Sequence, residues 1–175
     1  GAAFSKKRQF RLVAKERIAK NTERLYERDM GLAIGFLLLG GYLLGSIPSA
    51  VWIGRWFYGV DVREHGSHNA GATNTLRVLG RRAALPVFVV DAAKGYGAVM
   101  LSHFTSCEGD ALFLLKIALT AAAILGHIFP LFAGFKGGKG VATMAGCMLA
   151  IAPVPMLMGL ATFVVVLAVS HYVSL

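Results

Sequence analysis

Two glycine-rich polar segments contain the residue types of phosphate-binding loops. The first reads GSHNAGATN at residues 66–74 and is followed by Arg77. Glycines let the backbone approach a ligand closely, so successive amides can form an anion-binding nest. The hydroxyl and amide side chains add donors, and the Arg77 guanidinium is a planar fork that suits phosphate oxygens. We interpret this segment as a phosphate-binding loop; the alternative is a glycine-rich connector between two helices.

The second segment reads GFKGGKGVAT at residues 134–143. Lys136 and Lys139 are three residues apart and alternate with glycines, so ammonium groups and backbone amides can meet the same phosphate. A Walker A loop would need glycine and a hydroxyl residue where the chain has Ala133 and Gly140, so this motif is excluded. The alternative to a cationic binding loop is a basic anchor beside a membrane span.

His127, Asp91 and Lys94 are titratable residues inside apolar stretches, where ionisable groups are candidates for function. His127 precedes Pro130 by less than one helical turn, so it is either a functional residue or the partner of a carbonyl freed by that proline. Asp91 and Lys94 are three residues apart and share a helical face. They are either a buried pair that neutralises itself, the interpretation we favour, or part of the site.

The composition excludes an ordinary soluble domain, a disordered tail and a solenoid. Of the 175 residues, 56% are hydrophobic and 15% are charged, and the net charge is +9. Nine of the 18 basic residues lie in the first 28 positions. We therefore divide the chain into a basic polar arm, residues 1–30, and a transmembrane domain, residues 31–175. The positive charge suggests nucleic acid, anionic lipid or a phosphorylated substrate, and the apolar composition favours the last two. The two cysteines support neither a disulfide framework nor a zinc site.

Five apolar segments predict an all-α, polytopic helical integral membrane protein. A spanning helix needs about 20 apolar residues, and residues 31–54 contain no acidic residue, lysine or arginine. Residues 140–175 also lack these types but are too long for one span, and Pro153 and Pro155 divide them. The predicted spans are residues 31–54, 83–103, 111–135, 140–152 and 153–172.

Loop charges predict the orientation of these spans, because lysine and arginine mark cytoplasmic loops. The connections after the first and third predicted spans are basic, whereas residues 104–110 contain Glu108 and Asp110 and no basic residue. Both glycine-rich loops are therefore expected on the cytoplasmic face. One crossing would place the basic arm outside, which conflicts with its charge, so we interpret the arm as a foreign or mis-joined extension. A chain that begins with Gly1 and stops at Leu175 after an apolar segment is expected to be part of something longer.

Four motifs together resemble the bacterial acyl-phosphate:glycerol-3-phosphate acyltransferases, the PlsY family. They are GYLLGSIPS at 41–49, GSHNAGATNTLRVLG at 66–80, DAAKG at 91–95 and GHIFPLFAGFKGGKGVAT at 126–143. The resemblance implies transfer of a fatty acyl group from acyl-phosphate to the sn-1 hydroxyl of glycerol 3-phosphate, which gives lysophosphatidate and phosphate in the first step of phospholipid biosynthesis. It also implies the bacterial inner membrane, with membrane lipid as surroundings and no cofactor or metal.

The resemblance assigns site residues position by position. Catalytic roles fall on Ser46, Arg77, His127 and Lys139. Binding of substrate phosphate falls on Ser67, Asn69, Gly71, Thr73, Asn74, Lys136, Gly137, Gly138 and Gly140. Among these, Arg77 and Lys139 are our first candidates for gripping phosphate.

The chain departs from the family pattern at two places. His68 replaces a glycine that the family most often has in its Gly-Ser-Gly-Asn motif. The family has seven spans and a late Arg-His-x-x-Asn motif, whereas this sequence provides about five spans, so the activity of this chain by itself is an open point.

Two other functions are weighed against acyl transfer from acyl-phosphate. Acyltransferases that use acyl-CoA or acyl carrier protein rely on His-x-x-x-x-Asp, and none of the five histidines has aspartate five residues later. A transporter or channel for a phosphorylated small molecule could use the same basic loops. Transporters often contain two homologous halves, and the sequence has no internal repeat.

Overall fold

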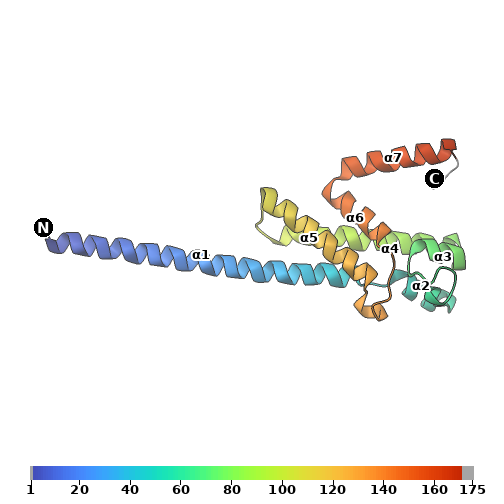
Figure 1. Ribbon diagram of the computed structural model, residues 1–175, viewed down its shortest axis with the longest axis horizontal. Helices are drawn as coiled ribbons and strands as arrows, with labels where there is room; N and C mark the ends of the chain where they lie inside the picture. Colours follow the sequence, from blue (N-terminus) through green and yellow to red (C-terminus); the bar gives the residue numbers. More distant parts are fainter. Residues whose placement is uncertain (1, 171–175) are drawn as a thin grey trace. The chain divides into compact units, whose positions relative to one another are not determined.

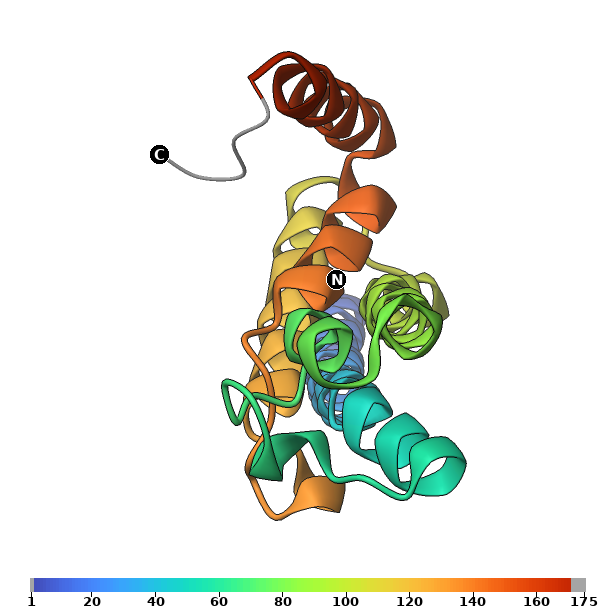
Figure 2. The same cartoon turned by 90° about the vertical axis from the view of Figure 1, so that its right-hand side faces the viewer.

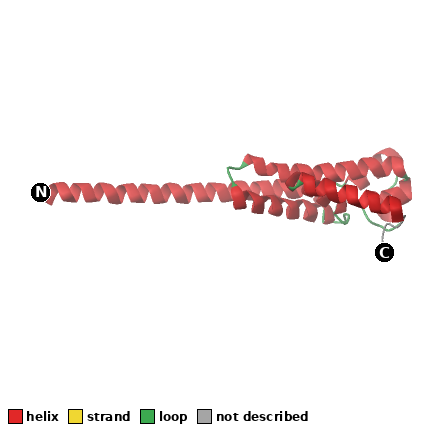
Figure 3. Ribbon diagram, turned by 90° about the horizontal axis from the view of Figure 1, so that it is seen from above, coloured by secondary structure: helices red, strands yellow, loops and turns green. Residues whose placement is uncertain are grey.

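The computed structural model describes residues 2–170, and all the regular elements in this range are helices (Figure 3). The α-helices are α1 (Ala2–Gly45), α2 (Ser49–Tyr58), α3 (Ala72–Leu79), α4 (Arg81–Met100), α5 (Gly109–Ile128), α6 (Val141–Ile151) and α7 (Pro153–Ser170). The short 3₁₀ helices are η1 (Val62–Glu64), η2 (Leu101–Phe104) and η3 (Leu131–Ala133). Contacts divide the chain into two units, Gly1–Phe36 and Leu37–Leu175. The site described below lies within the second unit.

Three helical segments are long and apolar enough to cross a membrane. They are Lys20–Tyr58, Arg81–Phe104 and Gly109–Ala133. The other two predicted spans correspond to the shorter apolar helices α6 and α7. Helix α6 has 11 residues, so it is about 16 Å long. That is about half of a hydrocarbon core of roughly 30 Å, and α6 therefore does not cross a bilayer by itself.

The first predicted span, residues 31–54, is not one continuous helix. Helix α1 ends at Gly45, and α2 begins at Ser49. Pro48 causes the break because it has no amide to donate and disfavours helical geometry at Ile47. The carbonyl of Ile47 accepts a 2.7 Å hydrogen bond from Lys94 Nζ. A buried lysine on α4 thus satisfies a carbonyl at the break.

Small residues bring α4 and α6 into close contact. One buried cluster contains Ala98 and Val99 of α4, Ala123 of α5 and Cys147 of α6. A side chain built at Gly95 would collide with the carbonyl oxygen of Thr143 on the facing helix. Glycine is therefore required here by the approach of two backbones rather than by a turn.

This contact predicts a difference between two glycines of α4. Gly95→Ala should lower the free energy of unfolding by about 1–3 kcal/mol, because the added methyl group overpacks the α4–α6 contact. Gly97 has no atom within 4 Å of the added group. Gly97→Ala should therefore be neutral or stabilise by up to about 1 kcal/mol through helix propensity. Thermal unfolding in detergent measures both, and equal stabilities of the two variants would contradict the packing.

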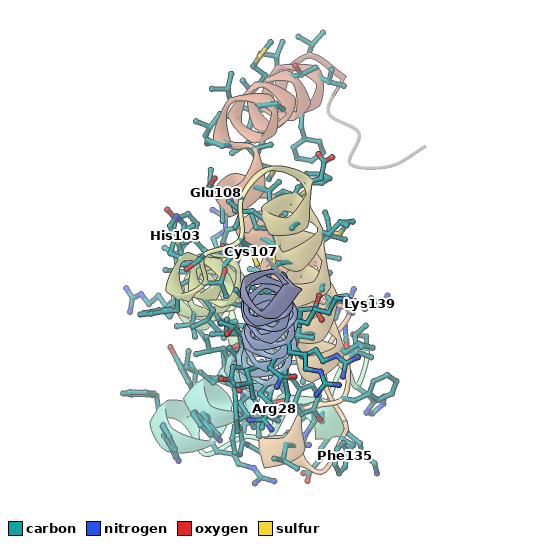
Figure 4. All side chains as sticks on the ribbon, turned by 90° about the vertical axis from the view of Figure 1, so that its left-hand side faces the viewer. Arg28, His103, Cys107, Glu108, Phe135 and Lys139 are labelled. Atoms are coloured by element: carbon teal, nitrogen blue, oxygen red, sulfur yellow. The ribbon has the colours of Figure 1, made fainter. Side chains whose placement is uncertain are left out.

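The chain reverses direction between α4 and α5, so the polar loops gather at one end of the helices. Figure 1 shows the turn after η2 at one end of α4 and α5, and the segments around α3 and η3 at the other. The labelled residues His103, Cys107 and Glu108 of that turn lie apart from Lys139 and Phe135 in Figure 4. The two glycine-rich loops thus lie at one end of α4 and α5, and residues 104–110 lie at the other end.

Candidate functional site

A cavity of about 280 Å³ lies where the two glycine-rich loops meet. Its wall also includes two residues of α4, Phe88 and Asp91, and one residue of α5, His127. The loops and helix starts contribute Ser67, Asn69, Gly71, Ala72, Thr73, Arg77, Lys139, Gly140, Val141 and Ala142. Eight of the thirteen residues that we assigned to the site from the sequence line this cavity: Ser67, Asn69, Gly71, Thr73, Arg77, His127, Lys139 and Gly140.

Hydrogen bonds join the segments that form the cavity. Arg63 Nη1 donates to the carbonyl of Ala133 at 2.7 Å, and the amide of Ala70 donates to the carbonyl of Gly137 at 3.4 Å. Figure 2 shows the segment before α3 beside the segment around η3. Residues about 70 positions apart in the sequence are therefore fixed against each other at the site.

Asp61 holds Arg63 in this bridging position. The Asp61 carboxylate accepts hydrogen bonds from the amide and the guanidinium of Arg63, and Arg55 Nη2 lies 2.8 Å from Asp61 Oδ2. The hydrogen bonds from Arg63 lower the pKa of Asp61 to about 2, although burial acts in the opposite direction. The ionised carboxylate is thus part of the folded loop structure.

The Asp61 network predicts a loss of stability in acid. The pKa of Asp61 is lower in the folded protein than the ordinary value of 3.8. The ionised Asp61 therefore contributes its full share of the folding free energy above about pH 4, and this stabilisation is lost as the pH falls from about 4 to 2. It amounts to at most about 2 kcal/mol.

Thermal unfolding of the wild type and of Asp61→Asn between pH 7 and pH 2 measures this contribution. The wild type should be more stable at pH 7, and the difference should shrink as the pH falls below 4. Asp110 is an exposed carboxylate on α5 with no ion pair among the described residues, so Asp110→Asn serves as the control and should change the stability at pH 7 less than Asp61→Asn does. A difference between wild type and Asp61→Asn that is constant with pH would contradict the assignment.

The first glycine-rich loop runs into the N-terminus of α3. Gly71 precedes this helix, and the carbonyl of Gly71 accepts a hydrogen bond from the amide of Thr75. Ala72 and Thr73 therefore belong to the first turn. Amides of a first turn have no partner within the helix and carry partial positive charge. Because Ala72 and Thr73 line the cavity, the amides of this helix start are placed where they could bind an anion.

The second loop places another helix start at the same cavity. Gly140 precedes α6 with a φ of 76°, which glycine adopts without strain. Val141 and Ala142 follow it in the first turn of α6 and line the cavity. Two helix N-termini therefore contribute to one cavity wall, where the sequence had suggested only loop amides.

Asn74 was expected to bind substrate phosphate, but the structure gives it another role. Its side chain is buried, and its Nδ2 donates to the carbonyls of Val62 at 2.7 Å and His65 at 3.1 Å. Its Oδ1 accepts from the amide of Ser67 at 2.8 Å. Asn74 is absent from the described cavity wall, and its hydrogen bonds instead fix the loop that presents Ser67.

Gly137 and Gly138 were also expected to bind phosphate through their amides. These amides donate instead to the carbonyls of Ile128 and His127 at the end of α5. A side chain at Gly137 would collide with the His127 carbonyl, and one at Gly138 would collide with the His127 ring. The two glycines therefore let the loop pack against the end of α5, and Lys136 is exposed and outside the described cavity wall.

Arg77 and Lys139 come from different loops and line the same cavity. Both are exposed residues, and neither forms an ion pair within the part of the chain that the structure describes. Their charges are therefore available to an anion in the cavity. This arrangement agrees with their selection from the sequence as the first candidates for gripping phosphate.

His127 and Ser46 differ in their position relative to the described cavity wall. His127 is buried in the cavity wall, where Nδ1 is hydrogen-bonded to Thr143 Oγ1 at 3.0 Å and lies 3.6 Å from Asp91 Oδ1. Ser46 is fully buried and donates to the carbonyl of Tyr42 at 2.8 Å, and it is not among the cavity residues. Of these two predicted catalytic residues, only His127 meets the cavity.

Asp91 and Lys94 form the predicted buried ion pair, with 2.8 Å between Nζ and Oδ1. Asp91 also lines the cavity, so the residue belongs both to a buried ion pair and to the candidate site. The Ser49 hydroxyl donates to the same Asp91 oxygen at 2.7 Å. We did not predict Phe88, Ser49 or Thr143 near the site; the proximity of Ser49 follows from the break in the first span, which the apolar pattern alone does not show.

The helices and the cavity define a polytopic membrane protein with a cavity between two loops that is lined by Arg77 and Lys139. A sequence profile of the family described as glycerol-3-phosphate acyltransferase matches residues 35–175. The glycerol-3-phosphate acyltransferase of Listeria welshimeri is 50% identical over 147 residues, which are 82% of this chain and 73% of that protein. The chain therefore belongs to the glycerol-3-phosphate acyltransferase family.

Solved structures agree with this assignment. One is the integral membrane glycerol 3-phosphate acyltransferase PlsY in its glycerol 3-phosphate form, with a TM-score of 0.67 and 36% identity. The match covers 77% of this chain and 66% of that chain. The lysophosphatidic acid form of PlsY has a TM-score of 0.63 and 35% identity, with 77% of this chain and 64% of that chain covered. The chain thus spans slightly less than two thirds of the solved PlsY chain.

Proposed function

We propose that this protein transfers a fatty acyl group from acyl-phosphate to the sn-1 hydroxyl of glycerol 3-phosphate. The observation that carries the proposal is one cavity that collects two helix N-termini and the charges of Arg77 and Lys139, which form no ion pair among the described residues. Such a cavity suits a phosphate group, and both substrates contain one. The relatives named for the same activity, including PlsY in glycerol 3-phosphate and lysophosphatidic acid forms, support the choice of substrates.

An apolar groove beside the cavity supports acyl-phosphate as the donor. The groove has a volume of about 410 Å³, lies along α3 and α4, and shares Ala72, Thr73 and Phe88 with the cavity. Leu76 and Leu85 are among its apolar lining residues. A ligand whose phosphate occupies the cavity can therefore place a hydrocarbon chain in the adjoining groove.

The proposed reaction requires positioning and charge stabilisation more than a strong nucleophile. The substrate hydroxyl oxygen forms a bond to the acyl carbonyl carbon, the bond between that carbon and the phosphate oxygen breaks, and phosphate leaves with the electron pair. The hydroxyl proton passes to the departing phosphate, so the products are the ester and hydrogen phosphate. Arg77, Lys139 and the helix starts bind the phosphates and stabilise the departing charge. We propose that no covalent acyl-enzyme and no metal take part.

We further propose the bacterial inner membrane as the location, with the cavity on the cytoplasmic face. The basic residues of the connections that carry both loops support this orientation, since lysine and arginine mark cytoplasmic loops. We also propose that residues 1–30 lie outside the acyltransferase domain, residues 31–175. The family match begins at residue 35, which supports this division.

Product formation in detergent tests the proposed function. This chain, and a version extended at its C-terminus to the length of the Listeria relatives, are incubated with glycerol 3-phosphate and palmitoyl phosphate. Lysophosphatidate and phosphate in equal amounts from either protein support the proposal. Absence of product from both overturns it, and equal rates with palmitoyl-CoA overturn acyl-phosphate as the donor.

Two additional measurements test the proposed mechanism and the transporter alternative. Turnover that EDTA abolishes and zinc restores, or a trapped acyl-serine, would overturn the mechanism. Substrate accumulation in sealed vesicles without product would favour the transporter, an alternative that the family assignment does not favour.

Gly71 gives a prediction about ground-state binding. Its backbone is extended, and a methyl group added to it would meet only Asn69 Nδ2, at 3.8 Å. The protein can therefore accommodate alanine at position 71. The added methyl group would hinder a bound ligand and not the protein's own packing. Gly71→Ala should raise KM for glycerol 3-phosphate several-fold and leave kcat nearly unchanged. Initial rates at varied substrate concentration measure this, and a fall in kcat alone would mean that the loop serves the leaving phosphate.

A further inference from the structure

Asp91 is the one carboxylate in the described wall of the cavity, and only one of its two oxygens is satisfied. It is 1% exposed. Oδ1 accepts from Ser49 Oγ at 2.7 Å and lies 2.8 Å from Lys94 Nζ. Oδ2 is buried and has no hydrogen-bond partner among the described residues. A buried carboxylate oxygen at a cavity wall is costly unless a donor meets it.

The other polar groups of the cavity determine what that donor can be. Arg77, Lys139 and two helix starts attract an anion, whereas a carboxylate repels one. A phosphate group should therefore lie toward the cations, and the part of the ligand beside Asp91 should be a neutral donor. A second cation is disfavoured, because Lys94 already neutralises Asp91.

We propose that Asp91 Oδ2 accepts a hydrogen bond from a hydroxyl group of the glycerol moiety. The cavity then binds its ligand at two ends, with the phosphate at Arg77 and Lys139 and a hydroxyl at Asp91. Asp91 thereby selects a phosphorylated polyol over a phosphate ester without hydroxyl groups. This inference rests on the proposed function and adds to it the residue that recognises the hydroxylated part of the substrate.

The surroundings of Asp91 hold it in place for this role. Lys94 donates both to Asp91 and to the carbonyl of Ile47 at the break between α1 and α2. Ser49 begins α2 directly after that break. The interrupted first span thus brings a carbonyl and a hydroxyl to the ion pair, which fixes Oδ1 and leaves Oδ2 for the ligand.

Equilibrium binding of two ligands in detergent tests the proposal without turnover. The probes are glycerol 3-phosphate and n-propyl phosphate, which has the same phosphate ester and no hydroxyl group. The wild type should bind glycerol 3-phosphate at least about 10-fold more tightly, as expected for a hydrogen bond to a charged group. Equal affinities in the wild type overturn this inference alone, whereas binding of neither probe overturns the proposed function.

Variants then assign the preference to Asp91. Asp91→Leu/Lys94→Met replaces the ion pair with apolar side chains and avoids an unpaired buried charge. It should bind the two probes with affinities within about 3-fold of each other, with affinity for n-propyl phosphate retained. Ser49→Ala, which removes only a donor to Oδ1, is the control and should keep the preference. A preference that persists in the double variant overturns the proposal.

A second variant decides the case in which the double variant binds neither probe. Asp91→Glu keeps the charge that pairs with Lys94 and moves the carboxylate by one methylene group. It should lose most of the preference for glycerol 3-phosphate while it still binds n-propyl phosphate. A full preference in Asp91→Glu overturns the proposal.

Discussion

Replacement of Lys139 by alanine is expected to lower kcat by about 10- to 100-fold, with a smaller change in KM for glycerol 3-phosphate. The lysine lines the cavity and has no ion pair among the described residues, so its ammonium group can follow the charge that develops on the departing phosphate. A charge-assisted contact of this kind contributes about 1.5–3 kcal/mol. Initial rates with palmitoyl phosphate and glycerol 3-phosphate provide both constants.

Lys136 is the matched control for Lys139. It has the same side chain in the same loop, but it is exposed and outside the described cavity wall. Lys136→Ala should change kcat and KM by less than about 3-fold, as expected for an exposed charge whose contacts are weak. Equal effects of the two substitutions would indicate that the loop acts only as a diffuse basic anchor.

Replacement of Arg77 by alanine is expected to raise KM for glycerol 3-phosphate by about 10- to 100-fold. Arg77 lies on α3, whose first turn also lines the cavity, and this group of donors should hold the substrate phosphate equally before and during the reaction. Arg77→Lys should restore only part of the affinity, because an ammonium group cannot make the two parallel hydrogen bonds of a guanidinium.

Arg82 provides the corresponding control for Arg77. It is an exposed arginine at the start of α4 and lines neither the cavity nor the groove that the structure describes. Arg82→Ala should leave KM within about 3-fold of the wild type. If Arg77→Ala instead lowered kcat and Lys139→Ala raised KM, the two loops would be assigned to the wrong phosphates.

Hydropathy and charge predicted the helices and the meeting of the two loops. Apolar length identified α4 and α5 as spans, because a lipid-facing backbone must satisfy its own hydrogen bonds. The basic residues of the two connections placed them on one face, and the bonds of Arg63 and Ala70 to the second loop agree with that. The apolar helices and the proximity of the two loops could therefore be predicted from the local composition of the sequence.

The pattern of residue types could not show which donors remain free. Asn74, Gly137 and Gly138 have the chemistry of phosphate ligands, yet their groups are used by the carbonyls and amides that hold the loops. Only the fold determines which amides begin a helix, and the starts of α3 and α6 supply donors that the sequence did not single out. Residue type thus identified the loops, but it did not show which of their residues hold the loop structure and which face the cavity.

Asp91 was only partly predictable for a related reason. Its spacing from Lys94 indicates a buried pair, and the 2.8 Å contact confirms it. Its position at the cavity depends on how α4 packs against α5 and α6, where glycine and small side chains allow close approach. Such packing is a tertiary property and leaves no periodic signal in the sequence.

The most direct test of the central claim is the coupling between Arg77 and Lys139 in kcat/KM. The measurement uses the wild type, Arg77→Ala, Lys139→Ala and the double variant under identical conditions. If the two loops form one phosphate site, the double variant should lose less than the product of the two single losses, with a coupling of about 1 kcal/mol or more. Losses that multiply without coupling would place the two residues at separate sites and contradict the account.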